Sequence, residues 1–317
     1  MHLIKSLLLI AILVTTICAR EIKPAFILNS KGIVNDFVID KSKLYAANNE
    51  GSIEIFDLYK QKLIGEIIIK PLKTTKGDFV KANIISVDRF KGKTLFVSTT
   101  TNGFKDVWLH DGVQLKQIIN SKQKLTVRKA KFINEENFLI ATVGHEVALF
   151  NNQDNYALYK KQLEQSTFTD IYISEDKSIM ATSSESGRVT ISDVKTGKIL
   201  KKLDSLNVDN IFSIAYHNGV IITGGRDRRV GVYPKDDKPY YIKSDFFVYG
   251  VSLTPNGKYG IYSSGLTHDL QLFDIKTGKN IDKLIGHNAI PTTIKFINEK
   301  ELFSSGYENK IFYWKLY

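Results

Sequence analysis

The 317-residue sequence predicts an all-β protein: a seven-bladed β-propeller of four-stranded blades, with the ring closed by an N-terminal strand. Three observations predict it. Seven segments share one pattern, they recur at a nearly constant spacing, and further strand-like runs surround each of them. The segments end at residues 57, 111, 151, 193, 234, 274 and 315, so successive ends lie 54, 40, 42, 41, 40 and 41 residues apart.

Each repeat contains four strand-like runs. In the fifth repeat, IFSIAY (211–216) and GVIITGG (219–225) precede a turn and a third run, RVGVY (229–233). Hairpins such as DVKTGKILKKL (193–203) and DIKTGKNIDKL (274–284) indicate a fourth strand, because Thr-Gly is typical of a tight turn between strands. Four antiparallel strands in about 40 residues are typical of one propeller blade.

The last repeat ends after its third strand, so its blade lacks one strand. The segment KPAFILN (23–29) precedes the first repeat and has the pattern of a short strand, in which Pro24 is tolerated near the start. We expect this segment to be the outer strand of the last blade. It would cover a sheet edge that could otherwise promote aggregation.

The N-terminus has the pattern of a signal peptide. Lys5 precedes an apolar run from Leu7 to Val14, and small or polar residues follow up to Ala19. The run is shorter than the roughly 20 apolar residues of a membrane-spanning helix. We therefore expect residues 1–19 to be a signal peptide cleaved near Cys18 or Ala19, and residues 20–317 to be one periplasmic propeller domain. Lipidation of Cys18, which the preceding Ile17 fits poorly, and a retained anchor stay open as alternatives.

The composition limits the chemistry and the partners. Cys18 is the only cysteine, so the cleaved protein would have no disulfide, no thiolate metal site and no thioether-linked haem. The net charge is +11 for the whole chain. Removing residues 1–19 deletes only Lys5 among the formally charged side chains. Outside the cytoplasm, this basic balance favours an acidic protein partner over nucleic acid. Contact with a membrane surface stays open, and we expect a monomer.

No catalytic, cofactor-binding or metal-binding residue is predicted, and we expect the protein not to be an enzyme. The KTGK sequences at 195–198 and 276–279 recur at one hairpin position and precede no helix, unlike a phosphate-binding loop. Turn geometry explains four recurring aspartates: Asp57, Asp111, Asp193 and Asp274. The alternative is a hydrolase, lyase or dehydrogenase with its site at the mouth of the central channel. A linear motif would not reveal such a site, because its residues would come from several blades.

Several residues carry a resemblance to the WD-repeat family. Asp227 stands six positions before the aromatic Tyr233, Gly286 and His287 form a Gly-His pair before the last blade, and Trp314 ends its third strand. The chain resembles this family over nearly all of residues 20–317. The resemblance implies structural roles for four side chains: Asp227, Tyr233, His287 and Trp314.

The match to the WD pattern is degenerate. The aromatic position holds His110 in the second repeat and Ser192 in the fourth, and the turn aspartate is replaced by Glu308 in the last. The stretch KLYAANNEGSIEIFD (43–57) also resembles bacterial propellers whose blades carry a YVTN-like strand. Both resemblances imply the same architecture.

A narrower resemblance is to the NapL type, exported WD-repeat accessory proteins of periplasmic nitrate reductase systems. The predicted signal peptide, the Lys- and Ile-rich composition, the absence of cysteine after residue 19 and the degenerate blades fit that type. The resemblance implies a non-catalytic scaffold that supports the assembly or electron supply of a nitrate reductase. The molybdenum, haem and iron–sulfur centres would belong to its partners, and this chain would hold no cofactor.

Basic residues gather in loops that a propeller brings to one face. The turns between second and third strands share this face with the loops that join blades, and Phe79, Phe104 and Phe246 fall nearby. We interpret this face as a docking surface for an acidic partner, with a merely solvated set of loops as the alternative. Its predicted partner-binding residues are Arg226, Arg228, Lys122, Lys124, Arg128, Lys129, Lys76 and Lys81.

Overall fold

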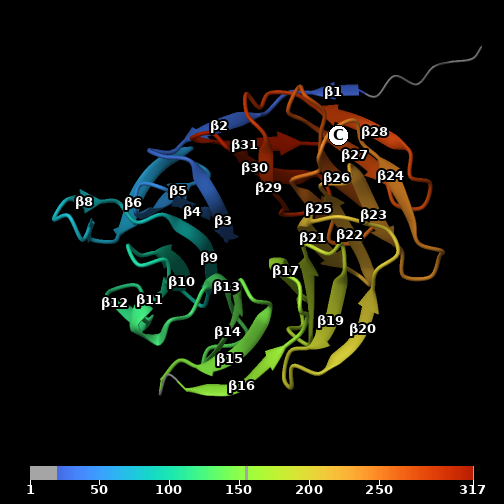
Figure 1. Cartoon of the computed structure of the whole chain (residues 1–317). Coiled ribbons are helices and arrows are strands. Elements are labelled where there is room, and N and C mark those ends of the chain that lie inside the picture. Colours follow the sequence, from blue (N-terminus) through green and yellow to red (C-terminus); the bar gives the residue numbers. More distant parts are fainter. Residues whose placement is uncertain (1–19, 154–155, 317) are drawn as a thin grey trace, which may run out of the picture.

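The computed structural model describes residues 20–153 and 156–316, so the predicted signal peptide and its cleavage site lie outside the described residues. Seven antiparallel sheets surround one axis (Figure 1), which confirms the seven-bladed β-propeller. Within the described residues, no helix is long and apolar enough to cross a membrane.

In blades 1 to 6, four consecutive strands run outwards in chain order, whereas blade 7 takes its outer strand from the N-terminal segment. Blades 1 to 3 are β3 to β6 (Val34–Asp40, Lys43–Asn48, Ser52–Asp57, Lys62–Ile68), β9 to β12 (Ile84–Phe90, Lys93–Thr99, Lys105–His110, Leu115–Ile119) and β13 to β16 (Val127–Phe132, Asn137–Thr142, Glu146–Asn151, Ala157–Gln162). Blades 4 and 5 are β17 to β20 (Phe168–Ile173, Ile179–Ser184, Val189–Asp193, Ile199–Leu203) and β21 to β24 (Ile211–His217, Val220–Gly225, Arg229–Tyr233, Tyr240–Lys243). Blades 6 and 7 are β25 to β28 (Val251–Leu253, Tyr259–Ser264, Asp269–Asp274, Asn280–Leu284) and β29 to β31 (Pro291–Phe296, Glu301–Gly306, Lys310–Lys315) with β2 (Phe26–Asn29).

The strand β2 closes the ring, as the sequence predicts. It pairs antiparallel with β31, placing Phe26 opposite Tyr313 and Asn29 opposite Lys310. The Phe26 and Tyr313 rings stack with their centroids 4.5 Å apart. Leu28 is buried in the apolar cluster between blades 7 and 1. The closing strand therefore adds core packing as well as backbone hydrogen bonds.

Two features were not predicted. The strand β1 (Arg20–Ile22) pairs in parallel with β28 and makes blade 6 five-stranded, and the Arg20 guanidinium lies 2.8 Å from the Asp282 carboxylate. Between blades 1 and 2, the short strands β7 (Leu72–Lys73) and β8 (Phe79–Val80) form an extra hairpin. This hairpin accounts for the spacing of 54 residues between the first two repeats.

The hydrophobic core is divided among the junctions between blades. The described residues contain seven clusters of buried apolar side chains, one at each junction of neighbouring blades. Alternate residues of one strand serve different junctions: in β5, Ile53 packs towards blade 2 and Phe56 towards blade 7. Both faces of every blade are therefore covered, and burial of this apolar surface stabilises the ring.

A buried polar chain crosses blade 7. The His287 ring lies with Nδ1 2.8 Å from Glu308 Oε1 and Nε2 2.7 Å from Ser304 Oγ. Trp314 Nε1 donates a hydrogen bond of 2.7 Å to the same Ser304 hydroxyl. Burial lowers the pKa of His287 although Glu308 opposes this shift, so the ring is neutral at neutral pH.

Blade 5 contains an equivalent chain with different residues. Thr223 Oγ1 donates to Asn207 Oδ1 at 2.5 Å, and Asn207 Nδ2 donates to Asp227 Oδ1 at 3.0 Å. The Asp227 carboxylate also accepts hydrogen bonds from the backbone N–H groups of Val208 and Arg229. It therefore joins the loop before the blade to the turn between β22 and β23.

Candidate functional site

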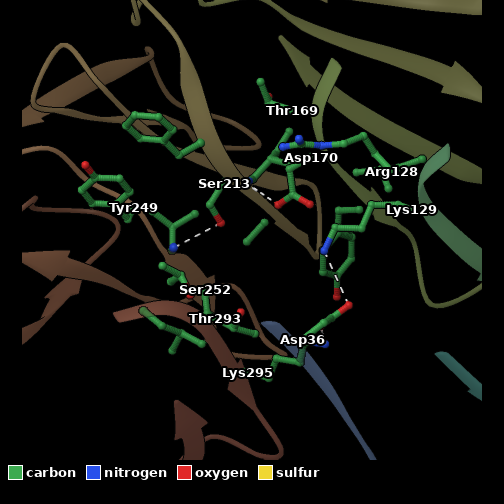
Figure 2. Close-up of a pocket in the computed structure, with 18 of the residues that line it drawn as sticks. Asp36, Arg128, Lys129, Thr169, Asp170, Ser213, Tyr249, Ser252, Thr293 and Lys295 are labelled. Atoms are coloured by element: carbon green, nitrogen blue, oxygen red, sulfur yellow. Dashed lines mark hydrogen bonds and ion pairs between the residues drawn. The ribbon is translucent and has the colours of Figure 1, made fainter. Parts of the chain in front are cut away.

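A cavity of about 780 Å³ follows the axis of the propeller. Residues from all seven inner strands or the loops just before them line it, and Figure 2 shows part of this lining. One mouth lies where the inner strands begin, and we call this the entry mouth. The cavity brings together side chains that are far apart in the sequence.

Irregular pairing near the start of the inner strands places extra residues at the entry mouth. In six of the seven described inner strands, the register with the second strand shifts by one residue. Such bulges leave one residue unpaired and redirect its side chain. The six extra residues are Asn35, Ile85, Arg128, Thr169, Phe212 and Thr292.

The residue after each bulge tends to join its blade to the next one. In four blades its side-chain oxygen accepts a hydrogen bond from a backbone N–H of the next inner strand. This repeated bond ties consecutive inner strands around the channel. The four bonds are Val87 N to Asp36 Oδ2 (3.3 Å), Ala130 N to Ser86 Oγ (3.4 Å), Ile214 N to Asp170 Oδ2 (3.2 Å) and Val251 N to Ser213 Oγ (3.3 Å).

Blade 3 breaks this pattern because Lys129 occupies the corresponding position. A lysine ammonium can only donate hydrogen bonds, so Lys129 offers no acceptor to Ile171 N–H, which corresponds to Ile214 N–H of the next blade. Its Nζ atom lies instead 3.5 Å from Asp36 Oδ2, across the channel in blade 1. Figure 2 marks this contact with a dashed line.

Asp36 is the centre of a buried charge cluster. Its carboxylate is 2% exposed, and Lys295 Nζ lies 2.9 Å from Oδ1. Burial opposes the charged form, but Lys129, Lys295 and Lys131 hold the pKa of Asp36 well below its usual range. For Lys295, burial outweighs the attraction of Asp36 and lowers the pKa of the ammonium.

The cavity lining has one more lysine or arginine than aspartate or glutamate, and it also includes His217, whose pKa is lowered by burial. This surplus gives the channel a net positive charge when all groups are ionised. The basic residues are Arg128, Lys129, Lys131, Lys177 and Lys295, and the acidic residues are Asp36, Asp88, Asp170 and Glu185.

A cluster of aromatic rings lies on the other side of the entry mouth, in blades 5 to 7. Phe212 and Tyr249 stack with centroids 4.7 Å apart, and Tyr249 meets the Tyr307 ring at 6.5 Å. Phe246 and Phe247 extend the cluster away from the channel. Tyr307 is 58% exposed. Figure 2 shows Tyr249 across the opening from Arg128 and Lys129.

Four of the predicted basic residues lie in two separate groups on the face of the entry mouth. Arg226 and Arg228 are exposed on the β22–β23 turn of blade 5, and Arg226 Nε lies 3.8 Å from Asp209 Oδ2. On the other side of the ring (Figure 1), between blades 2 and 3, Lys122 and Lys124 flank the end of the short helix η1 (Ser121–Gln123).

The remaining predicted residues are divided between the loops and the channel. Lys76 is exposed on the turn of the β7–β8 hairpin, near the 70% exposed Phe79, and Lys81 forms an ion pair with Glu50. Arg128 is exposed at the entry mouth, whereas the Lys129 side chain is 23% exposed and points into the cavity. The basic surface is therefore a rim around the entry mouth, not one continuous patch.

The opposite end of the cavity holds a short polar chain that sequence reasoning missed. The Tyr172 hydroxyl lies 2.5 Å from His217 Nε2, and Glu175 Oε1 lies 3.5 Å from His217 Nδ1. Burial raises the pKa of Tyr172 and lowers that of His217. Tyr172 is therefore not an ionised nucleophile near neutral pH. In the part of the chain that the structure describes, no group of three or more His, Cys, Asp and Glu residues could hold a metal ion.

Comparison with known proteins identifies the fold. No family model matches the sequence, and no curated protein matches it. Among solved structures, the chain is similar to the β-propeller domain of Cps50 (Swd1) from Myceliophteria thermophila, with a TM-score of 0.72 and 15% sequence identity over 93% of this chain and 99% of that chain. At this identity the similarity shows the fold alone, a β-propeller, and the sheet arrangement gives it seven blades.

Proposed function

We propose that the protein is a non-catalytic scaffold that binds an acidic protein through the face of the entry mouth. The observation that carries this proposal is the combination, on that one face, of a partly exposed aromatic cluster with a rim of basic loops. Aromatic and arginine side chains dominate the binding energy of protein interfaces, while peripheral charges speed association and select partners.

The propeller fold supports this assignment in general terms. Its loops present side chains from several blades on one face, and side-chain to backbone hydrogen bonds join four pairs of consecutive inner strands. A preorganised surface loses little conformational entropy when it binds a partner. The similarity to a WD-repeat-like propeller is compatible with a protein-binding role.

The more specific proposal is an exported accessory protein of a periplasmic nitrate reductase. Its support is the resemblance to the NapL type, carried by the predicted signal peptide, the missing cysteine after residue 19 and the degenerate repeats. Affinity purification from periplasmic extract of the native host, followed by mass spectrometry, tests this assignment. Recovery of reductase subunits would support it, and reproducible recovery of an unrelated partner would contradict it.

The general proposal is tested by reversing charges on the rim. The quadruple variant Arg226→Glu, Arg228→Glu, Lys122→Glu and Lys124→Glu should capture less partner from periplasmic extract than the wild type. Capture by the wild type should also fall at high salt, because charges more than about 8 to 10 Å apart are screened at physiological ionic strength. Both proteins should have the same melting temperature, since exposed loop charges contribute little to stability.

A matched control reverses four exposed lysines in turns at the opposite face: Lys41, Lys60, Lys195 and Lys276. This control should capture as much partner as the wild type. Equal capture by the wild type and both variants at low and high salt would contradict binding through the basic rim. Recovery of no protein in any condition would contradict the scaffold and favour the alternative of an enzyme with its site in the channel.

A further inference from the structure

We infer that the entry mouth contains a binding site for a carboxylate group attached to an apolar body. The carboxylate would lie between Arg128, Lys129 and the backbone N–H of Ile171, and the apolar body would pack on the rings of Phe212 and Tyr249. This site goes beyond the proposed scaffold function, because it would bind its ligand even if the rim captured no partner protein.

The junction between blades 3 and 4 lacks a side-chain acceptor. Wherever the residue after the bulge is Asp or Ser in these inner strands, its oxygen accepts the N–H of the next blade. Lys129 cannot do this, so the wall of the cavity at this junction presents an ammonium group and an N–H with no acceptor from blade 3. A ligand oxygen would complete the pattern that a protein oxygen completes in four other blades.

The entry mouth also offers positive charge to an anion. The described residues place no carboxylate within ion-pair distance of the Arg128 guanidinium, which is exposed at the same mouth. Asp36 and Asp170 already accept backbone N–H groups and are fixed in place. The lining has one more lysine or arginine than aspartate or glutamate, so one carboxylate would balance it. A carboxylate suits this place because its two oxygens can accept from a guanidinium and a second donor together.

An apolar wall lies opposite these donors. Phe212 and Tyr249 both line the cavity, and their stacked rings present a partly exposed apolar surface. The cavity volume of about 780 Å³ is within the range of small-molecule sites, about 300 to 1,000 Å³. A free organic acid and the carboxylate of a peptide have this same chemistry, so the experiment includes both sources.

Calorimetric titration with 3-phenylpropionate tests the site, with the neutral 3-phenylpropanamide as the matched control ligand. N-acetylphenylalanine and its amide test a peptide-like carboxylate in the same way. At least one acid should bind saturably at one site per chain, and its amide should bind much more weakly. Whichever acid binds more tightly identifies the source. Equal binding of acids and amides, or no binding of either acid at millimolar concentration, would overturn the proposal.

Two variants locate the site on the protein. Lys129→Ser introduces the residue that Ser86 and Ser213 represent in other blades, so it should restore the bond to Ile171 N–H and keep the fold while removing the ammonium. Arg128→Gln removes the exposed guanidinium. Each should weaken binding of the acid about ten- to a hundredfold, the usual effect of losing a charge-assisted hydrogen bond. Lys195→Gln, in an exposed turn at the opposite face, is the control and should bind like the wild type. Wild-type affinity in both channel variants would overturn the assignment.

Discussion

Two polar networks cross the blades of this propeller, and they differ in completeness. In blade 7, hydrogen bonds join four side chains, and each ring nitrogen has a partner: the side chains are His287, Ser304, Glu308 and Trp314. In the channel, Lys129 occupies a place where other blades supply an oxygen, and it reaches a carboxylate two blades away. The blade 7 network has no ring nitrogen left to bind a ligand. The channel network leaves two donors at the cavity wall, the Lys129 ammonium and the Ile171 N–H.

The difference indicates that some polar networks of this repeated fold stabilise a blade, whereas an incomplete network can bind a ligand. A satisfied polar chain covered by apolar side chains rigidifies its blade, and losing one member leaves the others unpaired and buried. A substitution that breaks the repeated bond costs some stability but creates a position where a ligand can supply the missing group.

The largest effect should come from removing the closing strand. Deletion of residues 23–29 removes β2 and its pairing with β31, and it exposes Phe303 and Ile311 of the cluster between blades 7 and 1. We expect aggregation, or a fall in melting temperature of more than about 10 °C. Deleting only residues 20–22, which form β1, is the control and should have a smaller effect. An unchanged melting temperature after removal of residues 23–29 would contradict closure by β2.

The next largest effect should come from substituting His287, the histidine of the polar chain in blade 7. His287→Ala creates a cavity and leaves Ser304 and Glu308 without their shared partner. The free energy of unfolding, measured with urea, should fall by about 2–4 kcal/mol. A change below about 1 kcal/mol would show that the chain in blade 7 contributes little to stability.

Asp227 should contribute less, because truncating its small side chain leaves a smaller cavity than truncating the imidazole of His287. Asp227→Ala removes an acceptor for Asn207, Val208 and Arg229. The free energy of unfolding should therefore fall by about 1–3 kcal/mol. The neighbouring exposed Arg228→Ala is the control for the turn itself. If Asp227→Ala kept full stability but lost partner capture, Asp227 would be a contact residue and our structural interpretation would be wrong.

A pH titration should show a smaller, graded effect. Burial lowers the pKa values of His145, His217 and His287, so below about pH 6.5 the unfolded chain binds more protons than the folded chain. Stability should therefore be complete above pH 6.5 and fall as the pH decreases towards 5. The melting temperature of His287→Gln should depend less steeply on pH in this window, and an identical slope in both proteins would exclude His287 as a source.

The sequence predicted the fold well because its information is repeated. Four strand-like runs recur seven times, and the incomplete last repeat pointed to residues 23–29 as the missing strand. The strand β1 was missed because three residues pairing with a strand 262 residues later leave no local pattern. Arg20 of β1, for example, donates a hydrogen bond to Asp282, which lies 262 residues later in the sequence.

The candidate site was much less predictable. Strand alternation suggests that Arg128 and Lys129 point in opposite directions, but the bulge in β13 brings both to the channel lining. From the sequence we expected both residues on the basic rim, but Arg128 is exposed at the entry mouth whereas Lys129 points into the cavity. The stacked pair Phe212 and Tyr249 comes from two blades, so no single segment signals it.

The most direct test of this account is the urea unfolding of Lys129→Ser with and without 3-phenylpropionate. If Lys129 binds a ligand and does not stabilise the fold, the free energy of unfolding of the variant should lie within about 1 kcal/mol of the wild-type value. The reason is that the new serine can accept the Ile171 N–H, as Ser86 and Ser213 accept backbone N–H groups of the next blade. The acid should stabilise the wild type but not the variant. A loss of about 3 kcal/mol or more in the variant, with equal stabilisation of both proteins by the acid, would show that Lys129 is a structural residue and contradict the account.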